Sequence, residues 1–160
     1  MNAMKENERL VKALRNAVEE AFSLIRNVTF DDPYEDADNP ILFFPTRTHI
    51  GEPGQAVDQL LHQILERTIS KHLPDALVIG EERHPTGMAF SKTFRLCAVI
   101  DALDGTAQLK ILSGAWGVVA LLYGINPDDL NDWMLLAAVV VDAEGGVVTN
   151  GRLDNFVELG

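Results

Sequence analysis

Residues 74–82 read Pro-Asp-Ala-Leu-Val-Ile-Gly-Glu-Glu, and the pattern of apolar residues changes at this stretch. Before Pro74, apolar residues recur every three or four positions, as they do on one face of an amphipathic helix. From Leu77 onward they form short runs rich in β-branched residues, which are typical of strands. The stretch therefore divides the chain into a helical first part and a β-rich second part.

Two amphipathic helices are predicted before Pro74. The first spans about residues 5–27, and its apolar stripe comprises Leu10, Val11, Leu14, Val18, Ala21, Phe22 and Ile25. The acidic residues 31–40 contain two prolines and predict a loop. A strand candidate at 41–44 and a polar link at 46–54 follow. The apolar face of the second helix comprises Val57, Leu60, Leu61, Ile64, Leu65 and Ile69.

Short apolar runs after Pro74 predict consecutive strands. They cover residues 77–79, 94–100, 116–122, 134–141 and 147–148. Residues 142–146, Asp-Ala-Glu-Gly-Gly, separate the last two runs and predict a hairpin turn. Helices followed by consecutive strands predict an α+β fold, with two helices packed on one face of a largely antiparallel sheet. We expect residues 1–160 to form a single domain without a C-terminal domain.

The composition narrows the class of protein. Thirteen Lys and Arg against 24 Asp and Glu give a net charge of −11, which argues against nucleic acid as a partner. Such acidity suits divalent cations or cationic partners, or serves only solubility. Cys97 is the only cysteine, so no intramolecular disulfide can form. No apolar stretch reaches the ~20 residues that span a bilayer, and no signal peptide is recognisable. These features predict a cytoplasmic protein that does not bind membranes.

Carboxylates gather where strands are predicted to end. Gly80-Glu81-Glu82 follows one run, and Asp-Ala-Leu-Asp-Gly-Thr at 101–106 follows the next. Asp101 and Asp104 could converge with the Leu103 carbonyl, and such hard oxygen ligands suit Mg²⁺, Mn²⁺ or Ca²⁺. Free N–H groups after the turn would favour a phosphate oxygen. An ordinary Asp-Gly turn explains the spacing equally well. The four histidines have no spacing that indicates metal ligands.

The two acidic motifs together resemble the inositol monophosphatase family of Mg²⁺-dependent phosphatases. Glu81 and Asp101 are twenty residues apart, and the order of elements over roughly residues 5–150 is similar to the N-terminal half of that family's fold. The resemblance implies hydrolysis of small sugar or inositol phosphates by metal-activated water. It also implies a Mg²⁺ cofactor, with Mn²⁺ as a possible substitute.

The resemblance assigns roles to individual residues. The implied metal ligands are Glu81, Asp101, the Leu103 carbonyl and Asp104. Gly105 and Thr106 would bind phosphate through backbone N–H groups. The Thr106 hydroxyl, paired with Glu52, would orient the attacking water. Asp58 and Glu82 would support the ligands from behind.

The sequence departs from the family pattern in ways that leave a second reading open. Ala102 stands in place of proline, Gln55 in place of threonine and Glu52 in place of aspartate. The metal-binding aspartate of the family's C-terminal half, within Trp-Asp-x-Ala, is not found. The alternative is a catalytically inactive, truncated family member that acts as an oligomerisation or partner-binding module.

The apolar strands predict how such a module would associate. We expect a homodimer, or a second polypeptide covering the sheet or supplying the other half. The residues predicted to need this cover are Val118, Ala120, Leu122, Leu136, Ala138 and Val140.

Overall fold

The computed structural model describes residues 3–30, 45–47, 53–82, 95–104, 116–126, 128–150 and 152–154. The helices among them are α1 (Ala3–Phe30) and α3 (Ala56–His72). The strands are β1 (Pro45–Arg47), β2 (Pro53–Gln55), β3 (Ala76–Gly80), β4 (Leu96–Asp104), β5 (Gly117–Asn126), β6 (Asp129–Asp142), β7 (Val147–Thr149) and β8 (Arg152–Asp154). The predicted loop at 31–40 and strand at 41–44 lie outside the described residues.

Strands β3 to β8 form one six-stranded sheet in which each strand lies beside its neighbour in the chain. β3 and β4 pair in parallel, and every later pair is antiparallel. The predicted turn at 142–146 joins β6 to β7, with Val141 opposite Val147. The predicted α+β class with a largely antiparallel sheet is confirmed.

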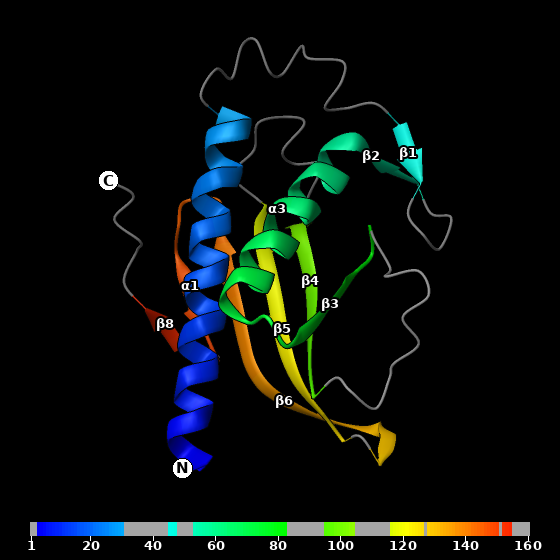
Figure 1. Cartoon of the computed structure of the whole chain (residues 1–160). Helices are drawn as coiled ribbons and strands as arrows, with labels where there is room; N and C mark the ends of the chain where they lie inside the picture. Colours follow the sequence, from blue (N-terminus) through cyan, green and yellow to red (C-terminus); the bar gives the residue numbers. More distant parts are fainter. Residues whose placement is uncertain are drawn as a thin grey trace.

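α1 and α3 lie side by side on one face of the sheet (Figure 1). α1 packs over β5 and β6, whereas α3 packs over β3 and β4. The stripe that α1 buries consists of Leu10, Leu14, Ala17, Val18, Ala21, Phe22 and Ile25. Phe22 stacks on Trp116 with ring centroids 5.8 Å apart, which joins this helix to the start of β5. The helices therefore cover one face of the sheet with a continuous apolar core.

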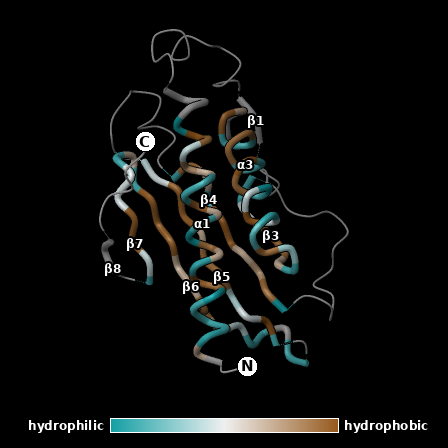
Figure 2. The backbone as a smooth tube through the Cα atoms, turned by 60° about the vertical axis from the view of Figure 1, so that its left-hand side comes forward, coloured by the Kyte–Doolittle hydropathy of each residue, from teal (hydrophilic) through white to brown (hydrophobic). Residues whose placement is uncertain are grey.

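The helices also contact each other through a polar cluster at the end of α3. Lys71 Nζ donates to both carboxylate oxygens of Glu20, at 2.7 and 3.0 Å, and His72 Nε2 lies 2.8 Å from Glu20 Oε2. The amphipathic character is visible in Figure 2, where each helix alternates between hydrophobic and hydrophilic colour while β4 to β6 are largely hydrophobic. Within the described residues, neither helix is long and apolar enough to cross a membrane.

The two faces of the sheet differ in burial, which corrects one prediction. Side chains alternate between faces along a strand. Val118, Ala120 and Leu122 are fully buried and belong to the core under the helices. Ala138 and Val140 point to the opposite face, where Val140 is 37% exposed. The six residues predicted to need external cover are thus divided between a covered face and an open one.

Residues 46–54, predicted as a polar link, include most of a small hairpin. β1 and β2 pair antiparallel, with Thr46 opposite Gly54. Each of these strands has three residues and begins with proline. Such short strands contain no alternating apolar pattern, so they could not be predicted from the sequence.

Candidate metal centre

The parallel pairing of β3 and β4 places two predicted metal ligands at the same edge of the sheet. Gly80 is the last residue of β3 and lies opposite Ile100 in β4. Glu81 follows Gly80, and Asp101 follows Ile100. Because the strands run in the same direction, Glu81 and Asp101 lie next to each other, Glu81 just beyond the end of β3 and Asp101 within β4. Proximity of residues twenty positions apart in sequence thus follows from strand register.

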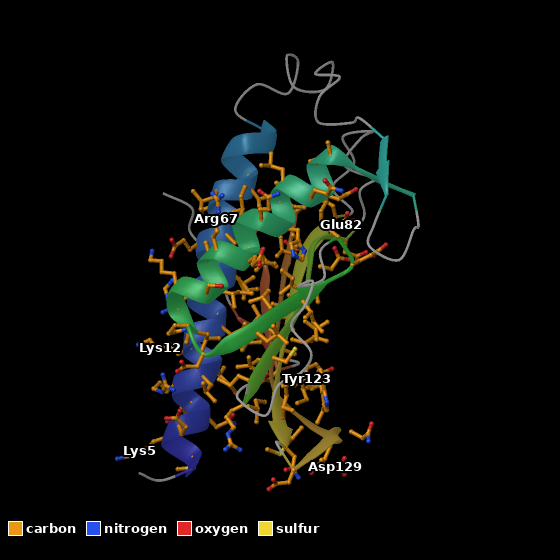
Figure 3. All side chains as sticks on the ribbon, turned by 45° about the vertical axis from the view of Figure 1, so that its right-hand side comes forward. Lys5, Lys12, Arg67, Glu82, Tyr123 and Asp129 are labelled. Carbon is orange, nitrogen blue, oxygen red and sulfur yellow. The ribbon has the colours of Figure 1, made fainter. Side chains whose placement is uncertain are left out.

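α3 brings a third carboxylate to this edge. Only residues 73–75 separate α3 from β3, so the helix runs antiparallel to the strand and begins where the strand ends. Asp58 lies in the first turn of α3 and is only 7% exposed. Figure 3 shows Glu82 at this end of the sheet, beside the start of α3, and Asp129 at the opposite end. The positive end of the helix dipole favours the negative charge of Asp58.

A β-bulge in β4 sets the direction of Asp101 and Asp104. Asp101 lies opposite Val119 and Asp104 opposite Gly117, so one extra residue is inserted in β4. Residues three positions apart point to opposite faces of a regular strand, and a bulge removes this restriction. Both aspartates are exposed, whereas the intervening Ala102 and Leu103 are buried in the core. The bulge therefore gives both aspartates access to solvent.

This bulge replaces the predicted turn. The strand was expected to stop at Asp101, but β4 continues through Asp104. Its irregular part is fixed by the Asp101 side chain, whose Oδ1 accepts a hydrogen bond from the Leu103 N–H at 3.1 Å. The carbonyl of Leu103 is an implied metal ligand. The side chain of Leu103 is only 5% exposed, so its packing in the core holds this residue in place.

Glu82 is the most perturbed carboxyl in the group. Burial raises the pKa of Glu82 to about 7, and repulsion from Asp58, Glu81 and Asp101 adds to the effect. Its Oε2 atom is buried and has no hydrogen-bond partner among the residues that the structure describes. An unpaired buried oxygen is costly unless a proton or a cation compensates it. The Glu82 carboxyl is therefore in a position that favours a bound positive charge.

Asp101 experiences the same accumulation of negative charge. Burial raises the pKa of Asp101, although part of the side chain reaches solvent, and repulsion from Asp104, Glu81 and Asp58 raises it further. The hydrogen bond from the Leu103 N–H lowers the pKa of Asp101. The same neighbours, Asp58 and Glu81, raise the pKa of both Glu82 and Asp101, so negative charge accumulates where the start of α3, the end of β3 and β4 come together. A cation bound among them would relieve this repulsion.

The donor chemistry of this group fits a hard divalent cation. Carboxylate oxygens are the ligands that Mg²⁺, Mn²⁺ and Ca²⁺ prefer, and Glu82 adds a buried oxygen without a partner. Among the residues that the structure describes, no three His, Cys, Asp or Glu side chains are already gathered into a metal-binding group. The fit therefore rests on donor type and charge rather than on a preformed coordination shell.

Asp58, Glu81, Glu82, Asp101 and Asp104 thus influence one another electrostatically, although no three of them are close enough in the described structure to form a metal-binding group. The predicted catalytic residues Glu52 and Thr106, and the predicted phosphate ligand Gly105, lie outside the described residues.

His62 is a residue of this region that the sequence did not indicate. It lies on α3, one helical turn after Asp58, and is only 2% exposed. A methyl group placed on Gly80 would lie 2.7 Å from His62 Cε1, so the imidazole packs directly against the end of β3. The available signal was the four-residue spacing from Asp58, which places both side chains on one helix face.

Comparison with known proteins supports the fold. No protein-family model matches the sequence, and no curated protein matches it significantly. Mycobacterium tuberculosis SuhB matches with a TM-score of 0.57 at 18% identity, over 89% of this chain and 44% of that chain. An IMPase/NADP phosphatase complexed with NADP and Ca²⁺ matches with a TM-score of 0.56 at 12% identity, over 92% of this chain and 53% of that one.

A third similar structure is inositol monophosphatase II from Staphylococcus aureus. It matches with a TM-score of 0.51 at 15% identity, over 90% of this chain and 50% of that chain. The chain thus spans about half the length of these solved structures. Its fold is that of the N-terminal half of inositol monophosphatase structures, as the resemblance between the acidic motifs predicted.

Proposed function

We propose that the chain acts in Mg²⁺-dependent hydrolysis of small phosphomonoesters, sugar or inositol phosphates, as an inositol monophosphatase does. The observation that supports this most directly is the group of carboxylates at the shared edge of β3 and β4. Burial and mutual repulsion raise the pKa values of Glu82 and Asp101 within it. A divalent cation and an anionic substrate would together balance the charge of this edge.

The residues of this edge have distinct roles in the proposal. Glu81, Asp101 and Asp104 would hold the cation, with the Leu103 carbonyl as a further oxygen ligand. The cation would supply Lewis acidity and lower the pKa of a nearby water. Glu82 and Asp58 would hold the ligands in place from the buried side. By resemblance, Gly105 and Thr106 would bind the phosphate, and Glu52 would accept a hydrogen bond from the Thr106 hydroxyl.

Similar structures add support for the ligand class. One of them is a phosphatase complexed with NADP and Ca²⁺, a phosphorylated molecule and a divalent cation. Because this chain spans about half of that protein, catalysis is proposed for the chain together with whatever covers its open sheet face.

A second candidate function is partner binding without catalysis. The observation that favours it is the exposed apolar surface of β6, where Met134 is 64% and Leu135 is 53% exposed. Surfaces of this kind mark interaction sites. In this alternative the carboxylates at the edge of the sheet have no catalytic role, and the sheet binds a second copy of the chain or another polypeptide.

Phosphate release separates the two candidates. The full chain is incubated with Mg²⁺ and a panel of inositol and sugar phosphates, and Asp104→Asn is compared with Asp129→Asn. Both aspartates are exposed, but Asp129 lies at the far end of the sheet (Figure 3). We expect Asp104→Asn to reduce turnover by more than about 10-fold, the lower bound for disturbing even a supporting residue, and Asp129→Asn to leave it unchanged. Turnover at background, or equal turnover by both variants, would contradict a catalytic role.

A further inference from the structure

His62 occupies a position where an apolar residue would be expected. Its neighbours on the buried face of α3 include Val57, Leu61 and Leu65, all with no exposed surface. His62 itself is 2% exposed. An imidazole has two ring nitrogens whose polarity must be satisfied when it is buried, so a leucine would fill this position at lower cost. A histidine in this apolar layer departs from the usual packing of a buried helix face, and such departures are expected mainly at functional sites.

The ring lies directly against the end of β3, beside the point where β3 pairs with the middle of β4. A Cβ atom on Gly80 would lie 2.7 Å from His62 Cε1 and 2.9 Å from Nδ1. The same atom would lie 2.7 Å from the carbonyl oxygen of Ile100. Helix α3, the end of β3 and the middle of β4 therefore meet at Gly80, and only a glycine at position 80 leaves room for the imidazole there.

The residues that follow this contact are the proposed ligands. Glu81 follows Gly80, and Asp101 follows Ile100. On the helix side, Asp58 lies one turn before His62 and is 7% exposed. Any change in the size or tilt of the side chain at position 62 would move the last residues of β3 relative to β4. The distance between the Glu81 and Asp101 carboxylates would change with them.

We infer that His62 is a positioning residue of the metal centre, whose buried ring fixes the end of β3 relative to β4 at Ile100 so that Glu81 and Asp101 converge on one cation. The inference rests on the proposed function, because it assigns His62 to the same site. His62 does not contact the cation in this scheme. It acts through the backbone of Gly80, in the way that supporting residues orient the ligands of other metal sites.

The test measures the affinity of the full chain for Mn²⁺ by titration calorimetry, without substrate. His62→Leu preserves burial and removes the ring nitrogens. We expect it to weaken Mn²⁺ binding about 10- to 100-fold, the range found for supporting residues. His62→Asn and His62→Gln place an amide near the positions of Nδ1 and Nε2, and we expect one of them to restore most of the wild-type affinity.

The matched control is Thr68→Val, another loss of a buried polar group from α3. Thr68 is 5% exposed, and its hydroxyl donates to the Leu65 carbonyl within the helix. It lies six residues beyond His62, about 9 Å farther along the helix axis. We expect Thr68→Val to lower the unfolding temperature and to leave Mn²⁺ affinity unchanged.

The possible results separate this inference from the proposed function. Absence of Mn²⁺ binding by the wild type would overturn both. Wild-type binding with equal affinity in His62→Leu, or equal weakening by Thr68→Val, would overturn the role of His62 and leave the metal centre intact. If His62→Leu does not fold, His62→Met, which also lacks the ring nitrogens, replaces it, and wild-type affinity in that variant would overturn the role.

Discussion

At the scale of single residues, the Glu82 carboxyl makes stability depend on pH. Its pKa is about 7 in the folded chain, against an ordinary value of 4.5. Between these values the folded chain retains a proton that the unfolded chain releases, so stability falls as pH rises through this window. We expect Glu82→Gln to remove this loss and to be more stable than wild type at pH 8 by about 1 kcal/mol, a value reduced for solvent screening.

Urea unfolding between pH 4.5 and 8, with chelator present, measures the effect. Below pH 4.5 the two proteins should be equally stable, because the carboxyl is then protonated in both folded and unfolded chains. Glu144→Gln is the control, since Glu144 is exposed in the turn between β6 and β7. A difference between wild type and Glu82→Gln that is constant across the whole pH range would contradict the assignment.

Position 80 requires glycine because α3, β3 and β4 approach one another closely there. An added methyl group would lie 2.7 Å from both His62 Cε1 and the Ile100 carbonyl oxygen, and the backbone oxygen cannot move aside cheaply. We expect Gly80→Ala to lower the free energy of unfolding by about 1–3 kcal/mol, the usual cost of overpacking.

Gly124→Ala is the matched control for Gly80. The nearest atom to its added methyl group, Leu136 Cδ1, would lie at 3.4 Å, an ordinary contact distance. Its effect on urea unfolding should stay within about 0.5 kcal/mol. Similar losses in both variants would show that the clash at position 80 is relieved by local adjustment.

The residue types of the candidate site could be predicted from the sequence, whereas their arrangement could not. Glu81, Asp101 and Asp104 stood out because each follows an apolar run. A bulge, however, depends on the register with β5, which a single strand does not encode. His62 was missed because an isolated histidine on a helix has no spacing typical of ligands. Its importance depends on Gly80, a residue on another element.

At the scale of elements, the turn between β6 and β7 has an identifiable stabilising residue. Asp142 Oδ1 accepts hydrogen bonds from the backbone N–H groups of Glu144, at 3.0 Å, and Gly146, at 2.8 Å. Gly145 adopts a φ of 88°, which glycine tolerates without strain. We expect Asp142→Ala to cost about 1–2 kcal/mol in urea unfolding, because two hydrogen bonds are lost.

Asp142→Asn tests whether these hydrogen bonds are the cause. Asparagine retains an acceptor oxygen at the same position, so this variant should lose clearly less stability than Asp142→Ala. Asp129→Ala provides a control, because Asp129 is exposed at the start of β6 and its Oδ1 accepts a hydrogen bond from the Asn131 N–H, at 3.0 Å. Equal losses in the alanine and asparagine variants of Asp142 would contradict the explanation.

Elements with strong periodicity were predicted well, and those defined by pairing were not. α1 and α3 bury most of the predicted stripes, because a 3.6-residue period is a local property, but Leu60, which was predicted on the apolar face of α3, is 37% exposed. β3 and the turn at 142–146 were also recognisable locally. The ends of β4, β5 and β6 extend beyond the apolar runs, since hydrogen bonds to a neighbouring strand continue into polar sequence. The hairpin of β1 and β2 likewise depends only on pairing.

At the scale of the whole molecule, none of the described helices lies over one of the two faces of the sheet. α1 and α3 cover the opposite face, and their contacts account for the fully buried residues of β5 and β6. On the open face, Ala138, Val119 and Leu121 are only partly buried, and Val140 is 37% exposed. The packing of a helical layer on a sheet could be predicted from the sequence pattern. Because both faces of the sheet are apolar, however, the sequence does not indicate which face the helices cover. That choice depends on how α1 and α3 pack together.

We expect the chain to self-associate through this open face. Val140→Lys places a charge at its exposed part and should shift the sedimentation coefficient at micromolar concentration to that of a monomer. Leu60→Lys is the matched control, since Leu60 is also 37% exposed but lies on α3, on the other side of the molecule. The experiment requires physiological salt, because a net charge of −11 repels copies of the chain at low ionic strength. A monomeric wild type, or equal effects of both substitutions, would contradict association through the sheet.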